Sequence, residues 1–102
     1  MNEVKILGLK DGALEVALTG EIDFAKAESF YTAVMEGYKA TPADIVFDCA
    51  SLEFIDSTTL GTFVKILKAV KTDGFTMKLV GLQPKIKKLF VICALDTIIT
   101  IA

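Results

Sequence analysis

The side chains of this sequence best suited to chemistry are the hydroxyls and the carboxylate of Phe54-Ile-Asp-Ser-Thr-Thr-Leu-Gly61. Apolar residues recur at helical spacing from Leu60 to Val70, so this stretch predicts the beginning of a helix. Ser57 is the predicted N-cap, because its hydroxyl could accept a hydrogen bond from a free amide of the first turn. The same amides and the positive end of the helix dipole favour an anion such as a phosphate. Ser57 is therefore a candidate both for a structural cap and for a phosphorylation site.

Enzymatic chemistry at this stretch is disfavoured by the residue types that the sequence lacks. There is no histidine, which removes the usual general base, the usual zinc ligand and the Ser-His-Asp triad. Asp56 or Asp23 would be a poor base for the Ser57 hydroxyl. The glycines follow neither the GxxxxGK(S/T) nor the GxGxxG spacing of phosphate loops. We therefore predict that the protein is not an enzyme and that it holds no cofactor and no metal.

Length and composition predict one globular domain. The 102 residues suffice for one core, so we predict a single domain over residues 1–102. The longest apolar run, Leu89 to Leu95, is far shorter than the ~20 residues that cross a bilayer. The first residues lack the basic and apolar regions of an export signal, and we expect a cytoplasmic protein without a membrane partner. Cys49 and Cys93 form no CxxC pair and lie in apolar stretches, which predicts free thiols in the core.

Charge is distributed unevenly along the chain, although the net charge is only −2. Residues 1–64 carry 11 acids against 4 lysines, whereas residues 65–88 carry 7 lysines against Asp73 alone. A nucleic-acid surface would favour arginines and aromatic platforms among the lysines, and neither is present. We therefore interpret the lysines as a solvated face and predict no nucleic-acid partner.

Hydrophobic periodicity in the first half predicts a hairpin, a helix and a central strand. The strand-like runs Val4–Leu9 and Ala13–Leu18 are joined by a Lys10-Asp-Gly12 turn. A helix is predicted from Phe24, with Asp23 as its N-cap and Thr41-Pro42 as its end. A strand is predicted at Asp44–Asp48. Its apolar centre, Ile45-Val-Phe47, indicates that both faces of this strand are buried by other parts of the protein.

The second half alternates helices with extended segments. The helix that begins near Ser57 should end at Thr72-Asp-Gly74, where glycine suits a left-handed C-cap. The remaining predicted elements are an extended segment at Phe75–Val80, a helix from Pro84 and a strand at Ile98–Ile101. In that helix Ile86, Leu89, Phe90 and Cys93 recur at the i, i+3, i+4 and i+7 spacing of one helical face. Right-handed crossovers make the later strands parallel, so the fold class is α/β, a mixed sheet with an N-terminal antiparallel hairpin and helices packed on it. The loops before the helices at Asp23 and Ser57 should then share one edge of the sheet.

Three segments of the sequence together resemble one protein family. Phe54-Ile-Asp-Ser57, two small residues and then Leu60-Gly61 resemble the phosphorylation-site motif of the bacterial STAS-domain anti-sigma factor antagonists. The resemblance extends to Leu18-Thr-Gly-Glu-Ile-Asp23 and to Pro84-Lys-Ile-Lys-Lys-Leu-Phe90, and so covers nearly the whole chain. It implies a single STAS-like domain with the mixed sheet described above.

The resemblance also implies a regulatory function. In that family the unphosphorylated protein binds an anti-sigma factor and releases a sigma factor. The anti-sigma factor is itself an ATP-dependent serine kinase, which would phosphorylate Ser57 and end the interaction, and a phosphatase would reverse the switch. ATP and magnesium would belong to the partner. The partner-binding residues implied in this sequence are Asp23, Asp56, Ser57, Thr58, Thr59, Leu60 and Gly61.

Departures from the family pattern keep two alternatives open. Thr59 stands where the family usually has glycine, which predicts a steric obstacle beside the phosphoacceptor and an altered choice of partner. Cys93-Ala-Leu95 replaces a small-Gly-Leu sequence, and the sequence stops at Ala102 without the closing helix of many relatives. One alternative is therefore a diverged STAS interaction subunit of another signalling or transport complex, without a sigma-factor role. The other concerns the modified residue, because the hydroxyls of Thr58 and Thr59 adjoin Ser57.

Overall fold

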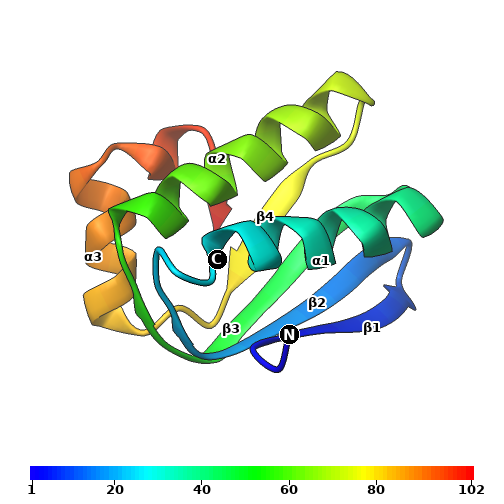
Figure 1. Ribbon diagram of the computed structural model, residues 1–102. Helices are drawn as coiled ribbons and strands as arrows, with labels where there is room; N and C mark the ends of the chain where they lie inside the picture. The colour runs from blue at the N-terminus through cyan, green and yellow to red at the C-terminus, as the bar shows by residue number, and fades with distance from the viewer.

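The computed structural model describes all residues, 1–102, as a five-stranded mixed sheet with three helices (Figure 1). The elements in chain order are β1 (Val4–Lys10), β2 (Ala13–Ile22), α1 (Ala27–Ala40), β3 (Asp44–Ile55), α2 (Ser57–Thr72), β4 (Met77–Val80), α3 (Pro84–Ile92), a 3₁₀ turn (Leu95–Thr97) and β5 (Thr100–Ile101). The strands lie in the order β1-β2-β3-β4-β5, with β1 antiparallel to β2 and every other pair parallel. The predicted fold class is confirmed.

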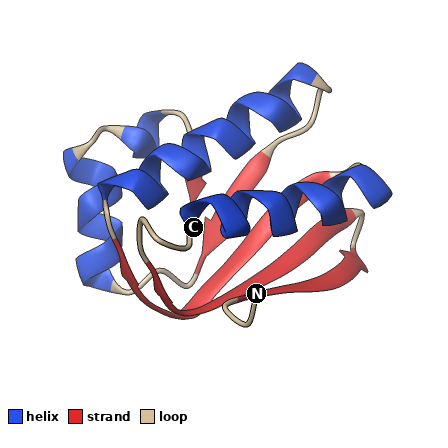
Figure 2. Ribbon diagram, viewed as in Figure 1, coloured by secondary structure: helices blue, strands red, loops and turns tan.

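The helices cover one face of the sheet, and Figure 2 shows α1 and α2 lying above the strands while the opposite face stays open. Burial along the central strand β3 follows this arrangement, because Ile45 and Phe47 are fully buried whereas Val46 between them is partly exposed. The prediction that β3 is covered on both faces is therefore wrong. The apolar run reflects β-propensity at Val46 on the open face and burial on the other.

Four phenylalanines connect all the layers of the core. The Phe63 ring of α2 packs edge-to-face against Phe30 of α1, Phe47 of β3 and Phe90 of α3, with ring centroids 5.1, 5.4 and 5.4 Å apart. Edge-to-face pairs at these distances contribute about 0.5–1.5 kcal/mol each beyond area burial. The start of α2 is thus held on a core shared by every helix.

Strands β2 and β3 are longer than the sequence predicted. β2 continues past Leu18 to Ile22 through Gly20, which has a φ of +68°, and β3 continues past Asp48 to Ile55. The pairing shifts register on both sides of Gly20, and Ile22 finally lies opposite Ile55. Gly20, which lies beyond the predicted end of this strand, allows a bulge, the local irregularity that keeps an imperfectly alternating strand in the sheet. The loops that follow both strands therefore begin side by side.

The remaining elements confirm most predicted ends. Gly74 follows α2 with a φ of +85°, and Pro84 is the first residue of α3. The last strand begins only at Thr100, because a 3₁₀ turn precedes it.

Cys49 is buried, and burial raises the pKa of its thiol to about 12, but Cys93 is exposed, so its predicted place in the core is wrong. No helix is long and apolar enough to cross a membrane.

Candidate functional site

The candidate site is formed where the loops after β2 and β3 enter α1 and α2. The last residues of the two strands, Ile22 and Ile55, are register partners, and the prediction that both loops share one edge of the sheet is confirmed. Asp56 connects the loops. Its Oδ2 accepts a 2.7 Å hydrogen bond from the Phe24 amide, and its Oδ1 accepts one of 3.0 Å from the Thr59 amide.

Asp56, rather than Ser57, is the N-cap of α2. Its backbone is extended, and its carboxylate accepts the amide three residues on, as an N-cap side chain does. Ser57 is already the first helical residue. The N-cap prediction for Ser57 is therefore wrong by one position. The Asp56 carboxylate caps the helix instead, and it also accepts the hydrogen bond of the Phe24 amide. The Ser57 side chain is exposed and makes no hydrogen bond within the protein.

The Asp56 carboxylate is held in its charged form. Burial alone would raise its pKa, but the hydrogen bonds from the Thr59 and Phe24 amides outweigh this and lower the pKa below its usual value. At neutral pH the amino end of α2 thus already holds an anion, supplied by the chain itself. A phosphate on Ser57 would lie beside this carboxylate and would not meet an empty anion site.

Thr59 is fully buried, and its hydroxyl stabilises the junction of the two loops. Its Oγ1 donates to the Ile22 carbonyl oxygen at 2.6 Å and lies 3.1 Å from Oδ1 of Asp56. A side chain in this position cannot obstruct a partner, so the predicted steric role of Thr59 is wrong. The helical period contained the missing signal, since Thr59, Thr62, Phe63 and Ile66 share the inward face of α2. Leu60 is buried as well.

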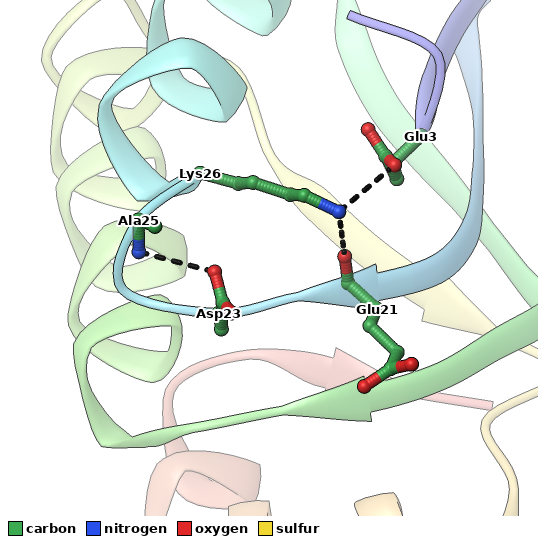
Figure 3. Close-up of polar contacts among 5 residues, drawn as sticks. All are labelled: Glu3, Glu21, Asp23, Ala25 and Lys26. Carbon is green, nitrogen blue, oxygen red and sulfur yellow. Dashed lines mark hydrogen bonds and ion pairs between the residues drawn. The ribbon is translucent and has the colours of Figure 1, made fainter.

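Asp23 orders the other loop without capping α1. Its Oδ1 accepts a 3.1 Å hydrogen bond from the Ala25 amide, two residues on, which closes a local turn (Figure 3). α1 begins at Ala27, and Lys26 occupies the N-cap position without a side-chain hydrogen bond to the helix. The predicted capping by Asp23 is therefore wrong by one turn, because four residues, Asp23 to Lys26, separate the strand from the helix. Asp23 itself remains partly exposed.

Lys26 and Glu3 belong to the same loop cluster, and sequence reasoning missed both. Lys26 Nζ lies 3.0 Å from Glu3 Oε2 and 3.2 Å from the Glu21 carbonyl oxygen (Figure 3). This is the only salt bridge of the structure. The two residues are 23 positions apart, and no local pattern predicts their contact. The Asp23 loop is thus bound on one side to Asp56, the N-cap of α2, and on the other to the segment before β1.

The outer surface of the site is a groove between α1 and α2. Phe24 is 72% exposed at its end, and the Lys65 ammonium lies 4.3 Å from the centre of the Tyr31 ring along its wall. Of the predicted partner-binding residues, Ser57, Thr58 and Gly61 are exposed, Asp23 and Asp56 are partly exposed, and Thr59 and Leu60 are buried. Thr58 and Gly61 line the groove, whereas Ser57 lies outside it. The arrangement offers exposed hydroxyls, carboxylates engaged in hydrogen bonds and one apolar ring. It suits recognition by another protein.

Comparisons with known proteins agree with this geometry. The STAS domain model matches residues 7–102. The anti-sigma-B factor antagonist of Bacillus subtilis (strain 168) is 34% identical over 94 residues, which cover 87% of this chain and 81% of that protein. A solved Thermotoga maritima protein assigned as an anti-sigma factor antagonist has a TM-score of 0.83 at 26% identity, covering 96% of this chain and 82% of that one. The phosphorylated form of the Bacillus cell fate determinant SpoIIAA has a TM-score of 0.74 at 17% identity, over 97% and 90% of the chains, and shares the fold. The chain therefore belongs to the STAS domain family, where it is related to the anti-sigma factor antagonists.

Proposed function

We propose that this protein is an anti-sigma factor antagonist that is switched off by phosphorylation of Ser57. In the unphosphorylated state it binds an anti-sigma factor and so releases a sigma factor. The anti-sigma factor acts as the serine kinase, with its own ATP and magnesium, and a phosphatase restores the active form. The observation that carries the proposal is the exposure of the Ser57 hydroxyl on the first turn of α2, beside the Asp23 loop.

Burial distinguishes among the three neighbouring hydroxyls. The Thr59 hydroxyl is buried and hydrogen-bonded, so a kinase could reach it only by unwinding the first turn of α2. Ser57 and Thr58 are both exposed. We favour Ser57 because it lies at the end of the helix, next to Asp56 and the Asp23 loop that a docked partner would cover. Thr58 lies instead in the groove between α1 and α2.

The partner surface of the proposal combines charge and one apolar anchor. Asp23, Asp56, Ser57, Thr58 and Gly61 would contact the anti-sigma factor directly, whereas Thr59 and Leu60 would support them from below. Aromatic rings are common binding hot spots, and the exposed Phe24 ring adjoins Asp56 and the end of the groove. A partner that buries the carboxylates of Asp23 and Asp56 must pair them with cations or with amide hydrogen-bond donors.

The test is to purify the protein from its own host and to map phosphate by intact mass and fragment analysis. Phosphate should reside on Ser57, and the unphosphorylated form should co-purify with an anti-sigma factor. Ser57→Ala should abolish modification and retain binding, while the matched Thr58→Ala should leave modification intact. Phosphate on Thr58 alone would refute the assignment. Recovery of a transporter or another signalling assembly, without any anti-sigma factor, would instead favour a diverged STAS interaction subunit.

A further inference from the structure

The loop Asp23-Phe-Ala-Lys26 must hold its shape for a partner to recognise it. Within the loop the Ala25 amide binds the Asp23 side chain, and the Lys26 amide binds the Asp23 carbonyl at 3.0 Å. Phe24 is attached to Asp56 by its amide alone, while its ring is largely exposed. Exposed hydrogen bonds of this kind open readily, so the loop needs a further attachment to stay ordered.

The segment before β1 supplies that attachment. Glu3 is itself fixed to the sheet, because its carbonyl accepts a 2.9 Å hydrogen bond from the Thr19 amide of β2. Its carboxylate then pairs with Lys26, whose ammonium also donates to the Glu21 carbonyl (Figure 3). One side chain thus bridges three backbone segments: the start of the chain, the end of β2 and the beginning of α1.

We propose that Lys26 is a positioning residue of the partner-binding site, which it orders through its ion pair with Glu3 and its bond to the Glu21 carbonyl. The inference rests on the proposed function for the partner, but its structural part does not. The side chains of Lys26 and Glu3 are 41% and 23% exposed, so water screens the pair and its effect is modest. A direct partner contact by Lys26 is the competing explanation, which the choice of variants must separate.

The first experiment follows amide hydrogen exchange of the isolated protein by NMR. In Lys26→Met the Phe24 and Ala25 amides should exchange about two- to fivefold faster, the range expected from losing an exposed ion pair. Glu3→Gln should give a similar increase without removing the lysine. Lys26→Arg keeps a donor for both oxygens and should restore exchange close to that of the wild type. Lys39→Met, which removes the same charge about 20 Å away at the other end of α1, is the matched control.

The second experiment measures the affinity of the same variants for the anti-sigma factor by calorimetry. Lys26→Met and Glu3→Gln should each weaken binding about two- to fivefold, with melting temperatures unchanged within error. Their double variant should lose no more than either alone, because both remove one interaction. Weaker binding in Lys26→Met but not in Glu3→Gln would make Lys26 a direct contact and overturn the proposal. Unchanged amide exchange in Lys26→Met would overturn it as well, whether or not any anti-sigma factor binds.

Discussion

The Phe24 amide donates a 2.7 Å hydrogen bond to Oδ2 of Asp56, although 32 positions separate the two residues. Oδ1 of the same carboxylate caps α2 through the Thr59 amide. One side chain therefore sets both the beginning of the helix and the position of the neighbouring loop. A substitution that removes the hydrogen bonds of the Asp56 carboxylate should therefore disturb both loops together.

Replacement of Asp56 should be costly for this reason. Asp56→Ala should lower the free energy of unfolding by about 1–3 kcal/mol, since it removes an N-cap and a second hydrogen bond. Asp56→Asn, which keeps one carbonyl acceptor, should cost less. Urea unfolding of the three proteins would measure both changes, and an Asp56→Ala variant as stable as the wild type would contradict the capping role.

The same carboxylate predicts a pH dependence. Because the pKa of Asp56 is lowered in the folded protein, its contribution to stability should be fully present above its ordinary pKa of about 4. It should be lost as the pH falls through the lower folded value. Stability curves below pH 5 should therefore be less steep in Asp56→Asn than in the wild type. Parallel curves for the two proteins would contradict this prediction.

Thr59 should behave as a core residue. Thr59→Gly should destabilise the protein by about 2 kcal/mol, combining lower helix propensity with the lost hydrogen bond to the Ile22 carbonyl. The exposed neighbour offers the control, since Thr58→Gly should cost only the propensity difference between threonine and glycine, about 0.3–0.5 kcal/mol. Thr59→Ser should restore most of the loss. Equal destabilisation in Thr59→Gly and Thr58→Gly would show that the buried hydroxyl contributes nothing.

The architecture was predictable because its signals are local and repeated. The Lys10-Asp-Gly12 turn, the helical faces and Pro84 at a helix start each follow from residue types at fixed spacing. The position of the two site loops at one edge followed from strand direction alone. Capping was not predictable in the same way, because several side chains near a helix start can accept an amide. The choice of Asp56 over Ser57 depended on the Phe24 amide, which only the folded sheet brings near.

Other features of the site were hidden for related reasons. The contact between Lys26 and Glu3 joins residues on different elements, and neither has a distinctive local pattern. The predicted strand ended at Leu18, yet an irregular pairing around Gly20 carries β2 on to Ile22. The exposure of Cys93 depends on the end of α3 leaving the core, which its apolar neighbours did not indicate.

Asp23 should contribute to binding more than to stability. Asp23→Asn keeps the oxygen that accepts the Ala25 amide, so its free energy of unfolding should stay within about 0.5 kcal/mol of the wild type. Asp23→Ala also loses the turn and should cost about 1 kcal/mol. If the charge faces the anti-sigma factor, both variants should bind more weakly than the stability loss explains. Wild-type affinity in Asp23→Asn would restrict Asp23 to its role in the turn.

Tyr38 predicts an alkaline transition at the opposite end of the helices. Its ring is buried and its hydroxyl donates a 2.6 Å hydrogen bond to Asp73, and burial together with this carboxylate raises the pKa to about 12. The stabilisation should be complete below the ordinary tyrosine pKa of about 10 and should fade as the pH rises toward 12. Tyr38→Phe should lack this loss between pH 10 and 12. Melting curves at high pH would compare the two, and identical pH dependence would contradict the prediction.

Phosphorylation of Ser57 should change binding without unfolding the protein. The Ser57 side chain is exposed and supports no internal hydrogen bond, so its phosphate can remain in water and the melting temperature should stay within a few degrees. A docked partner, however, would have to bury about −1.5 to −2 added charges beside the ionised Asp56, a costly step unless a cation answers them. Lys26, the cation of the adjacent loop, is already paired with Glu3.

Affinity for the anti-sigma factor should therefore fall at least roughly tenfold, about 1.4 kcal/mol, in the phospho-Ser57 protein. Ser57→Asp carries less charge on a shorter side chain and should show a weaker loss, whereas Ser57→Ala should bind normally and resist modification. Calorimetric titrations and thermal melts of these four species separate the two effects. Unfolding on phosphorylation would make Ser57 a structural residue, and unchanged affinity of the folded phosphoprotein would remove the switch, because the buried anion would then cost the complex nothing.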